Sequence, residues 1–207
     1  MGKNLFLIFV LILSNTVLLI ILNNYIVQDD LYYFHFQDQY SYTKIGEIIE
    51  YRRKWLWISY IINPFILLIS IQIPVVMVYL GLYLSKLSVK YRDVLKAVLI
   101  AHFIFLIPIL LKIIWFSFYP VSLDALRYFH PLSLFSLFDP ELLQVWLYYP
   151  LKTLNLFEIV SWLVLAFFLA KFLRKSFDEM LRIVVLYYGS FMICWMVFVM
   201  FISISNG

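Results

Sequence analysis

The chain has 207 residues, of which 65% are hydrophobic, 14% are charged and 5 are glycine, and its formal net charge is +4. Soluble domains are about half apolar, so this composition excludes a soluble globular protein and predicts an all-α polytopic membrane bundle. The basic excess is typical of membrane proteins that keep lysine and arginine in their cytoplasmic loops, and it does not indicate nucleic acid binding.

The first apolar run covers residues 5–22 and follows Lys3. Two interpretations apply to it, a secretory signal peptide and a retained signal anchor. The run is longer than the apolar part of a signal peptide, and Asn23-Asn24-Tyr25 lacks the small residues of a cleavage site. We therefore expect residues 5–22 to remain as the first transmembrane helix.

Residues 23–54 form the first polar segment, which we expect outside the membrane. Its early part places carboxylates near His35, the kind of set that ligates a metal. One histidine without a second is a weak signal, and a solvated loop explains it better, so we expect no metal. The later part, residues 43–54, carries isoleucines on one helical face. This pattern predicts a short amphipathic helix on the membrane surface.

Residues 55–84 are too long for one straight crossing, because as a helix they would extend roughly 45 Å and the hydrocarbon core is about 30 Å thick. Pro64 and Pro74 each remove a backbone donor. The segment is therefore either one kinked, tilted span or an interfacial piece followed by a span. Asn63 and Gln72 lie near the prolines, where they would bind a substrate or satisfy freed carbonyl groups. We favour the second role.

The third span, residues 94–118, contains His102 and Lys112. An ionisable residue inside a span is costly, and it raises the question of a functional role such as proton transfer. A neutral packing histidine and a lysine whose flexible stem reaches the interface are the alternatives that we favour. Lys112 and Glu158 are both expected toward the outer face, which raises the hypothesis that they form an ion pair.

Residues 119–152 form a second external segment, which four prolines divide into pieces too short to cross the membrane. We expect it to lie on the membrane surface or dip into it, because aromatic residues settle at headgroup level. An exposed aromatic shelf that docks a partner is the other interpretation, and the sequence leaves both open. The residues of this candidate shelf are Phe135, Phe138, Trp146, Tyr148 and Tyr149.

Residues 154–170 and 183–204, joined by a charged turn at 171–182, bring the count to five spans in a single membrane domain of residues 1–207. Gly81 and Gly189 predict close helix packing. With the amino terminus in the cytoplasm and the carboxyl terminus outside, the inside segments hold most of the basic residues. These are Lys3, Lys86, Lys90, Arg92, Lys96, Lys171, Arg174, Lys175 and Arg182. The external Arg52-Arg53-Lys54 cluster argues against this orientation.

Three stretches carry a resemblance to a known family. Leu154-Asn155-Leu156-Phe157-Glu158 opens a span, a short basic turn follows at 171–175, and Tyr187-Tyr188-Gly189 lies in the closing span. From about residue 91 to its end, the chain thereby resembles Yip-type membrane proteins. The resemblance implies a five-span architecture with a cytoplasmic amino terminus, a non-enzymatic role and no site residues. The long cytoplasmic amino-terminal region of that family has no counterpart before residue 5, and the external segment 23–54 is unusual for it.

We expect a non-enzymatic accessory or scaffolding subunit of a larger membrane complex, with the lipid bilayer and other membrane subunits as partners and with no cofactor. A bacterial inner membrane is the expected location. The alternative is a small transporter or permease subunit. An enzyme would need catalytic groups that converge, and the sequence suggests no such set. The intramembrane polar residues that a transporter would use are Asn63, Gln72, His102, Lys112 and Glu158.

Overall fold

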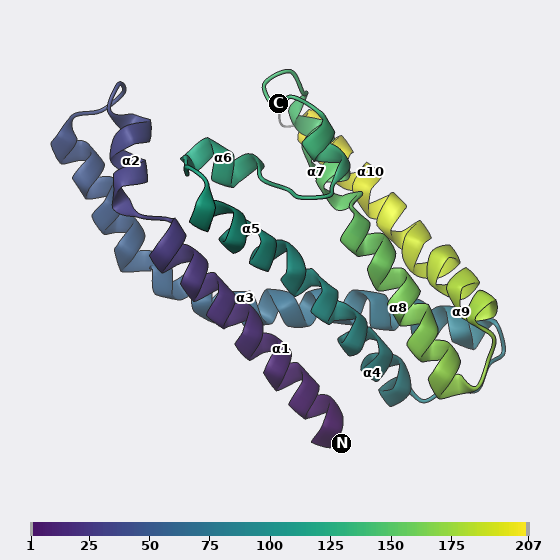
Figure 1. Cartoon of the computed structure of the whole chain (residues 1–207). Helices are drawn as coiled ribbons and strands as arrows, with labels where there is room; N and C mark the ends of the chain where they lie inside the picture. Colours follow the sequence, from purple (N-terminus) through teal and green to yellow (C-terminus); the bar gives the residue numbers. More distant parts are fainter. Residues whose placement is uncertain (1, 206–207) are drawn as a thin grey trace.

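The computed structural model of the chain describes residues 2–205 as an all-α bundle (Figure 1). Within this range, five helical segments are long and apolar enough to span a membrane. They are Gly2–Ile26, Tyr42–Leu84, Tyr91–Phe118, Leu156–Leu173 and Phe177–Ser205. The first of these spans begins and the fifth ends at opposite ends of the bundle, as an odd number of crossings requires.

Several of these spans are composite. The α-helices are α1 (Gly2–Ile21), α2 (Asp29–Phe36), α3 (Tyr42–Leu84), α4 (Tyr91–His102), α5 (Leu106–Phe118), α6 (Leu123–Tyr128), α7 (Val145–Thr153), α8 (Leu156–Leu173), α9 (Phe177–Ile183) and α10 (Ser190–Ser205). π-Helical turns η1 (Leu22–Ile26) and η4 (Val184–Gly189) follow α1 and α9. The 3-10 turns are η2 (Phe103–Phe105), between α4 and α5, and η3 (Leu134–Leu137).

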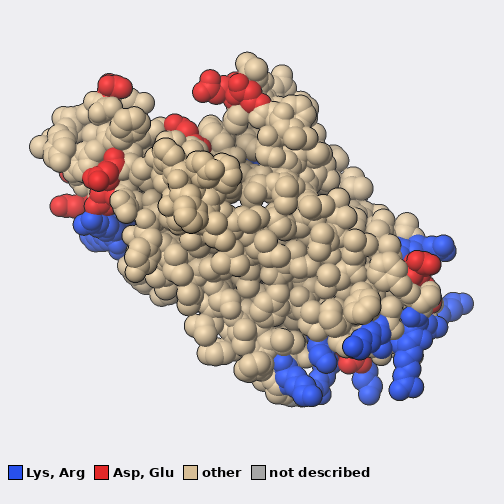
Figure 2. Space-filling view, in the orientation of Figure 1, with Lys and Arg blue, Asp and Glu red and all other residues tan. Residues whose placement is uncertain are grey.

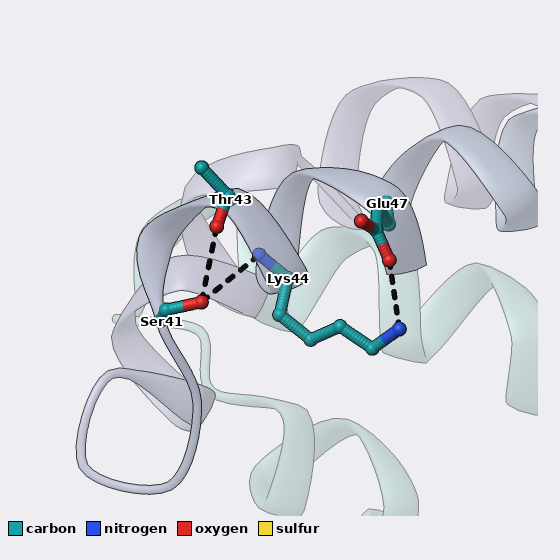
Figure 3. A network of polar contacts seen from close by, with 4 residues as sticks. All are labelled: Ser41, Thr43, Lys44 and Glu47. Atoms are coloured by element: carbon teal, nitrogen blue, oxygen red, sulfur yellow. Dashed lines mark hydrogen bonds and ion pairs between the residues drawn. The ribbon is translucent and has the colours of Figure 1, made fainter.

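Polar side chains fix where several helices begin. Figure 3 shows the start of α3, where Ser41 Oγ accepts the backbone N–H of Lys44 at 3.4 Å and Lys44 Nζ lies 2.7 Å from Glu47 Oε2. A side-chain oxygen in this position satisfies a backbone donor that has no partner inside the helix. Ser122, Asn155 and Ser176 cap α6, α8 and α9 in the same way.

Helix α3 corrects the prediction of a separate surface helix at residues 43–54. Those residues are the first turns of one continuous helix of 43 residues, because no breaker separates them from the apolar run. At 1.5 Å per residue it is roughly 65 Å long, about twice the thickness of the hydrocarbon core. Figure 1 shows α3 changing direction near its middle, the part that contains Pro64. Of the two alternatives for residues 55–84, the structure has the kinked helix.

The third and fifth spans also depart from regular α-helix. Pro108 has no N–H for the carbonyl group of Ile104, which lies at the centre of η2, so the helix tightens there. The turn before the fifth span is shorter than predicted. Helix α8 ends at Leu173, Arg174 has the left-handed φ of 54°, and α9 begins at Phe177. The charged residues near this turn do not end α8 or α9, because the backbone hydrogen bonds inside a helix form in water as well as in lipid.

The main core lies where α3, α4, α8 and α9 meet, and α1 contributes Leu11. Lipid is as apolar as these side chains, so close packing rather than water exclusion holds the helices together. Gly81 provides such packing: a Cβ there would lie 2.4 Å from the ring of Tyr187 in η4. A Cβ on Gly189 would lie 3.0 Å from the ring of Trp162 in α8. The close packing predicted at both glycines is therefore confirmed.

Charged residues gather at the two ends of the molecule, and an uncharged band separates them (Figure 2). Lysine and arginine dominate the end that holds the α3–α4 and α8–α9 turns, whereas aspartate and glutamate prevail at the other end. The Arg52-Arg53-Lys54 cluster also lies at the acidic end, and its two arginines bind other residues of the first external segment. Arg53 forms an ion pair with Asp29, and Arg52 donates to the carbonyl groups of Asn23 and Val27, each at 3.5 Å.

Candidate functional site

The intramembrane polar residues tie pairs of helices together. Asn63 Nδ2 donates to Asn15 Oδ1 at 2.6 Å, which joins α3 to α1. His102 is buried in α4, and its Nε2 lies 3.2 Å from Ser70 Oγ of α3. Gln72 of α3 accepts a hydrogen bond from the Tyr91 hydroxyl at the start of α4. One contact joins α3 to α1 and two join α3 to α4, and no hydrogen bond links the three into one polar path in the part of the chain that the structure describes.

The hypothesis of a Lys112–Glu158 ion pair is wrong. Lys112 Nζ donates instead to the backbone carbonyl group of Leu126 in α6. Helix α5 packs against α1 and η1, and Figure 1 shows that it diverges from α8 toward the outer end. The two side chains therefore lie on helices that are not neighbours at this end of the bundle.

Glu158 lies in the first turn of α8 and is 9% exposed. Its Oε1 accepts two hydrogen bonds, one from Trp162 Nε1 at 2.8 Å and one from the Tyr188 hydroxyl at 2.9 Å. Tyr188 belongs to η4, so the carboxylate joins the fourth span to the fifth. The positive end of the helix dipole also favours a carboxylate in this turn.

Sequence reasoning missed the partners of these residues. The spacing of Glu158 and Trp162 at i,i+4 was a signal for one contact, because such residues are neighbours on a helix. Tyr188 comes from a distant part of the chain, and no local pattern indicates its contact. Asn4 was also missed: it is buried in α1 and donates to the carbonyl group of Arg92 at 3.0 Å.

The external residues 119–155 fold over the start of α8. Leu134 N–H donates to the Leu154 carbonyl group and Leu156 N–H donates to the Leu132 carbonyl group, each at 2.9 Å. This short antiparallel pairing fixes Phe135, which is 1% exposed. Phe135 is therefore a packing residue, and its proposed place in an exposed aromatic shelf is corrected.

The other four shelf residues differ in exposure. Trp146 and Tyr148 are half-buried, whereas Phe138 and Tyr149 are exposed. Three aliphatic residues of the same segment are more exposed, Leu137 at 74%, Leu142 at 83% and Val145 at 73%. Leu137 lines the pocket beside Glu158, and we name four of the other exposed residues the outer apolar surface: Phe138, Leu142, Val145 and Tyr149.

The first external segment also touches the second. His35 Nδ1 of α2 lies 3.3 Å from Asp124 Oδ2 of α6. Asp29 is one of the carboxylates near His35 in the sequence, and it pairs with Arg53. In residues 2–205, no three His, Cys, Asp or Glu side chains come together in a way that would hold a metal ion.

His130 makes the second external segment sensitive to acid. Burial, assisted by the positive charges of Lys152 and Lys112, lowers the pKa of His130 from 6.5 to about 4, and a backbone hydrogen bond to Arg127 opposes this shift. Between pH 6.5 and 4 the unfolded chain therefore binds a proton that the folded chain does not, so stability falls as the pH falls through this range. For a half-buried group we expect a loss of about 1–2 kcal/mol.

The measurement is thermal unfolding in a non-ionic detergent at several pH values from 7 to 4. A His130→Gln variant lacks this titration, so its unfolding temperature should depend less on pH. An equally steep dependence in the variant would show that another group is responsible.

The five spans, the uncharged band and the charged ends define a multi-pass integral membrane protein. No protein-family model, no curated protein and no solved structure matches this chain.

Proposed function

We propose that the protein is a non-enzymatic, Yip-like accessory or scaffolding subunit that binds another integral membrane protein through the outer apolar surface. The observation that carries this proposal is the exposure of Leu142 and Val145 beside Asp139 and Glu141, which are also exposed. Carboxylates prefer water, so this surface lies at or beyond the membrane boundary. Large aliphatic side chains grouped there are typical of an interaction site.

The placement of the polar residues supports a scaffold over a transporter. A carrier would bring polar groups of several spans to one site near the middle of the membrane. Asn63, His102 and Glu158 instead each bind within their own pair of helices. We therefore assign them a structural role.

The test is recovery of the partner from native membranes. The double variant Leu142→Ala and Val145→Ala should reduce the amount of co-purified partner by about tenfold, because central apolar contacts carry most of the energy of an interface. Both side chains are exposed, so the protein level should not change.

The matched control is Val197→Ala with Ile204→Ala, two aliphatic residues of α10 that are also more than half exposed. This control should leave recovery of the partner unchanged. Equal recovery with the wild type and the Leu142/Val145 variant would exclude this surface, and equal loss in the control would indicate a general effect of lipid-facing residues.

We propose further that the protein lies in a bacterial inner membrane with its amino terminus in the cytoplasm. The grouping of basic residues at one end of the bundle supports this orientation (Figure 2). Of the basic residues that oppose this orientation, Arg53 forms an ion pair with Asp29, and Arg52 binds the backbone carbonyl groups of Asn23 and Val27.

Cysteine labelling in intact cells tests the orientation. Ser88, Ser176, Ser41 and Ser136 are all exposed, and Cys194 is replaced by serine because it is exposed as well. Cysteines at positions 41 and 136 should react with an impermeant thiol reagent, whereas those at positions 88 and 176 should react only after the cells are opened. The reverse pattern would overturn the proposal.

A further inference from the structure

A pocket of about 480 Å³ opens beside Glu158 at the outer end of the bundle. It is lined by residues 132–134, 136 and 137, by residues 153–155, by the first turns of α8 and by Met192 of α10. Its volume lies in the range of small-molecule sites. The walls are mostly apolar, with Leu134, Ile159 and Trp162 among them, so an occupant must be largely apolar itself.

Glu158 supplies the only acidic group among the residues that line this pocket. Its Oε1 is occupied by Trp162 and Tyr188, but Oε2 accepts no hydrogen bond from residues 2–205 and is not fully buried. The three ion pairs found in this range involve other carboxylates. Burying a carboxylate away from water costs free energy unless a cation or several hydrogen-bond donors compensate for the charge. A cationic donor at Oε2 would therefore stabilise the ionised form of Glu158.

The remaining polar residues of the pocket have already used their donors. The hydroxyl groups of Ser133, Ser136 and Thr153 donate to backbone carbonyl groups at 2.7–2.8 Å. Asn155 Nδ2 donates to the carbonyl groups of Lys152 and Thr153 at 3.1 and 3.0 Å. The lining therefore offers acceptor oxygens without free side-chain donors, which suits a ligand that donates hydrogen bonds and does not suit an anion.

We propose that this pocket binds an amphiphile with a primary ammonium head and an apolar chain. The ammonium group donates to Glu158 Oε2 and supplies the counter-charge, while the chain lies against Leu134, Ile159 and Met192. Two sources share this chemistry, a bilayer lipid with an ethanolamine head and a free long-chain amine. None of the four residues of the outer apolar surface lines the pocket.

The experiment is a native mass spectrometry titration of the full chain in non-ionic detergent. The probes are phosphatidylethanolamine, phosphatidylglycerol, dodecylamine and dodecanol. At least one amine probe should bind about tenfold more tightly than its partner without an ammonium group. Preference for the lipid alone identifies a membrane lipid, preference for dodecylamine alone identifies a free amine, and preference for both shows that the ammonium head suffices. Preference for neither amine overturns the proposal.

Glu158→Gln should abolish this preference without removing the binding of dodecanol. The glutamine oxygen can still accept from Trp162 and Tyr188, while its NH₂ group replaces Oε2. Glu141→Gln makes the same change on an exposed residue outside the pocket and should bind like the wild type. An unchanged preference in Glu158→Gln would overturn the proposal.

Leu134→Trp provides a second test that does not depend on the folding of Glu158→Gln. Leu134 is partly exposed and lines the pocket, so the larger side chain should fill the pocket and weaken amine binding about tenfold while Glu158 is intact. Amine binding at the wild-type level in this variant would place the ligand elsewhere.

Discussion

Replacing Phe135 by alanine is expected to lower the free energy of unfolding by about 3–4 kcal/mol. Phe135 is almost fully buried, and its ring lies 5.2 Å from that of Tyr148 and 5.6 Å from that of His130, centroid to centroid. Lys152 Nζ lies 4.8 Å from the centroid of the same ring. The substitution removes these contacts together and leaves a cavity, and the backbone pairing of residues 132–134 with residues 154–156 limits its collapse.

Phe138→Ala is the matched control, because the same side chain is removed three residues away at a position that is 51% exposed. It should change stability by no more than about 0.5 kcal/mol. The comparison uses denaturant unfolding in detergent, with unchanged helicity as the check on the folded state. Similar losses in the two variants would show that Phe135 does not organise the external segment.

Gly81→Ala should destabilise the protein by about 2–3 kcal/mol, although alanine is the better helix former. Its Cβ would lie 2.4 and 2.6 Å from Cδ2 and Cγ of Tyr187. These atoms lie close to the backbone of η4, so the whole turn would have to move. The same measurement of unfolding in detergent reports this loss.

Gly46→Ala tests the same change in the same helix, where a Cβ would meet only the Tyr33 hydroxyl at the ordinary distance of 3.6 Å. It should raise stability by up to about 1 kcal/mol through helix propensity. The double variant Gly81→Ala with Tyr187→Leu should recover part of the loss, since the ring that causes the overlap is gone. A loss that persists unchanged in the double variant would point to a cause other than contact with Tyr187.

The five spans were predictable because each is an apolar run long enough to cross a bilayer, and lipid permits hardly any other structure. Their ends were not predictable from charge. Lys171 remains inside α8 and Arg182 inside α9, because intrahelical hydrogen bonds continue into water until a residue such as Arg174 adopts a left-handed conformation. Helix α3 continues across a polar segment for the same reason.

The contacts of the polar residues were much less predictable. Sequence placed Lys112 and Glu158 at similar depths, but depth does not determine which helices are neighbours. The partners of Glu158 depend on η4 lying beside α8, and the burial of Phe135 depends on pairing between residues 132–134 and 154–156. Such contacts join distant parts of the chain, so periodicity and composition do not reveal them.

The ion pair between Arg53 and Asp29 has a consequence for how the chain enters the membrane during synthesis. In the proposed orientation, residues 23–54 must cross the bilayer, and a cluster of three basic residues resists such translocation. The segment also carries five carboxylates against four lysines and arginines, so as a unit it is slightly acidic. Folding of α2 back on the start of α3 before export would carry Arg53 across as an ion pair with Asp29 rather than as a free cation.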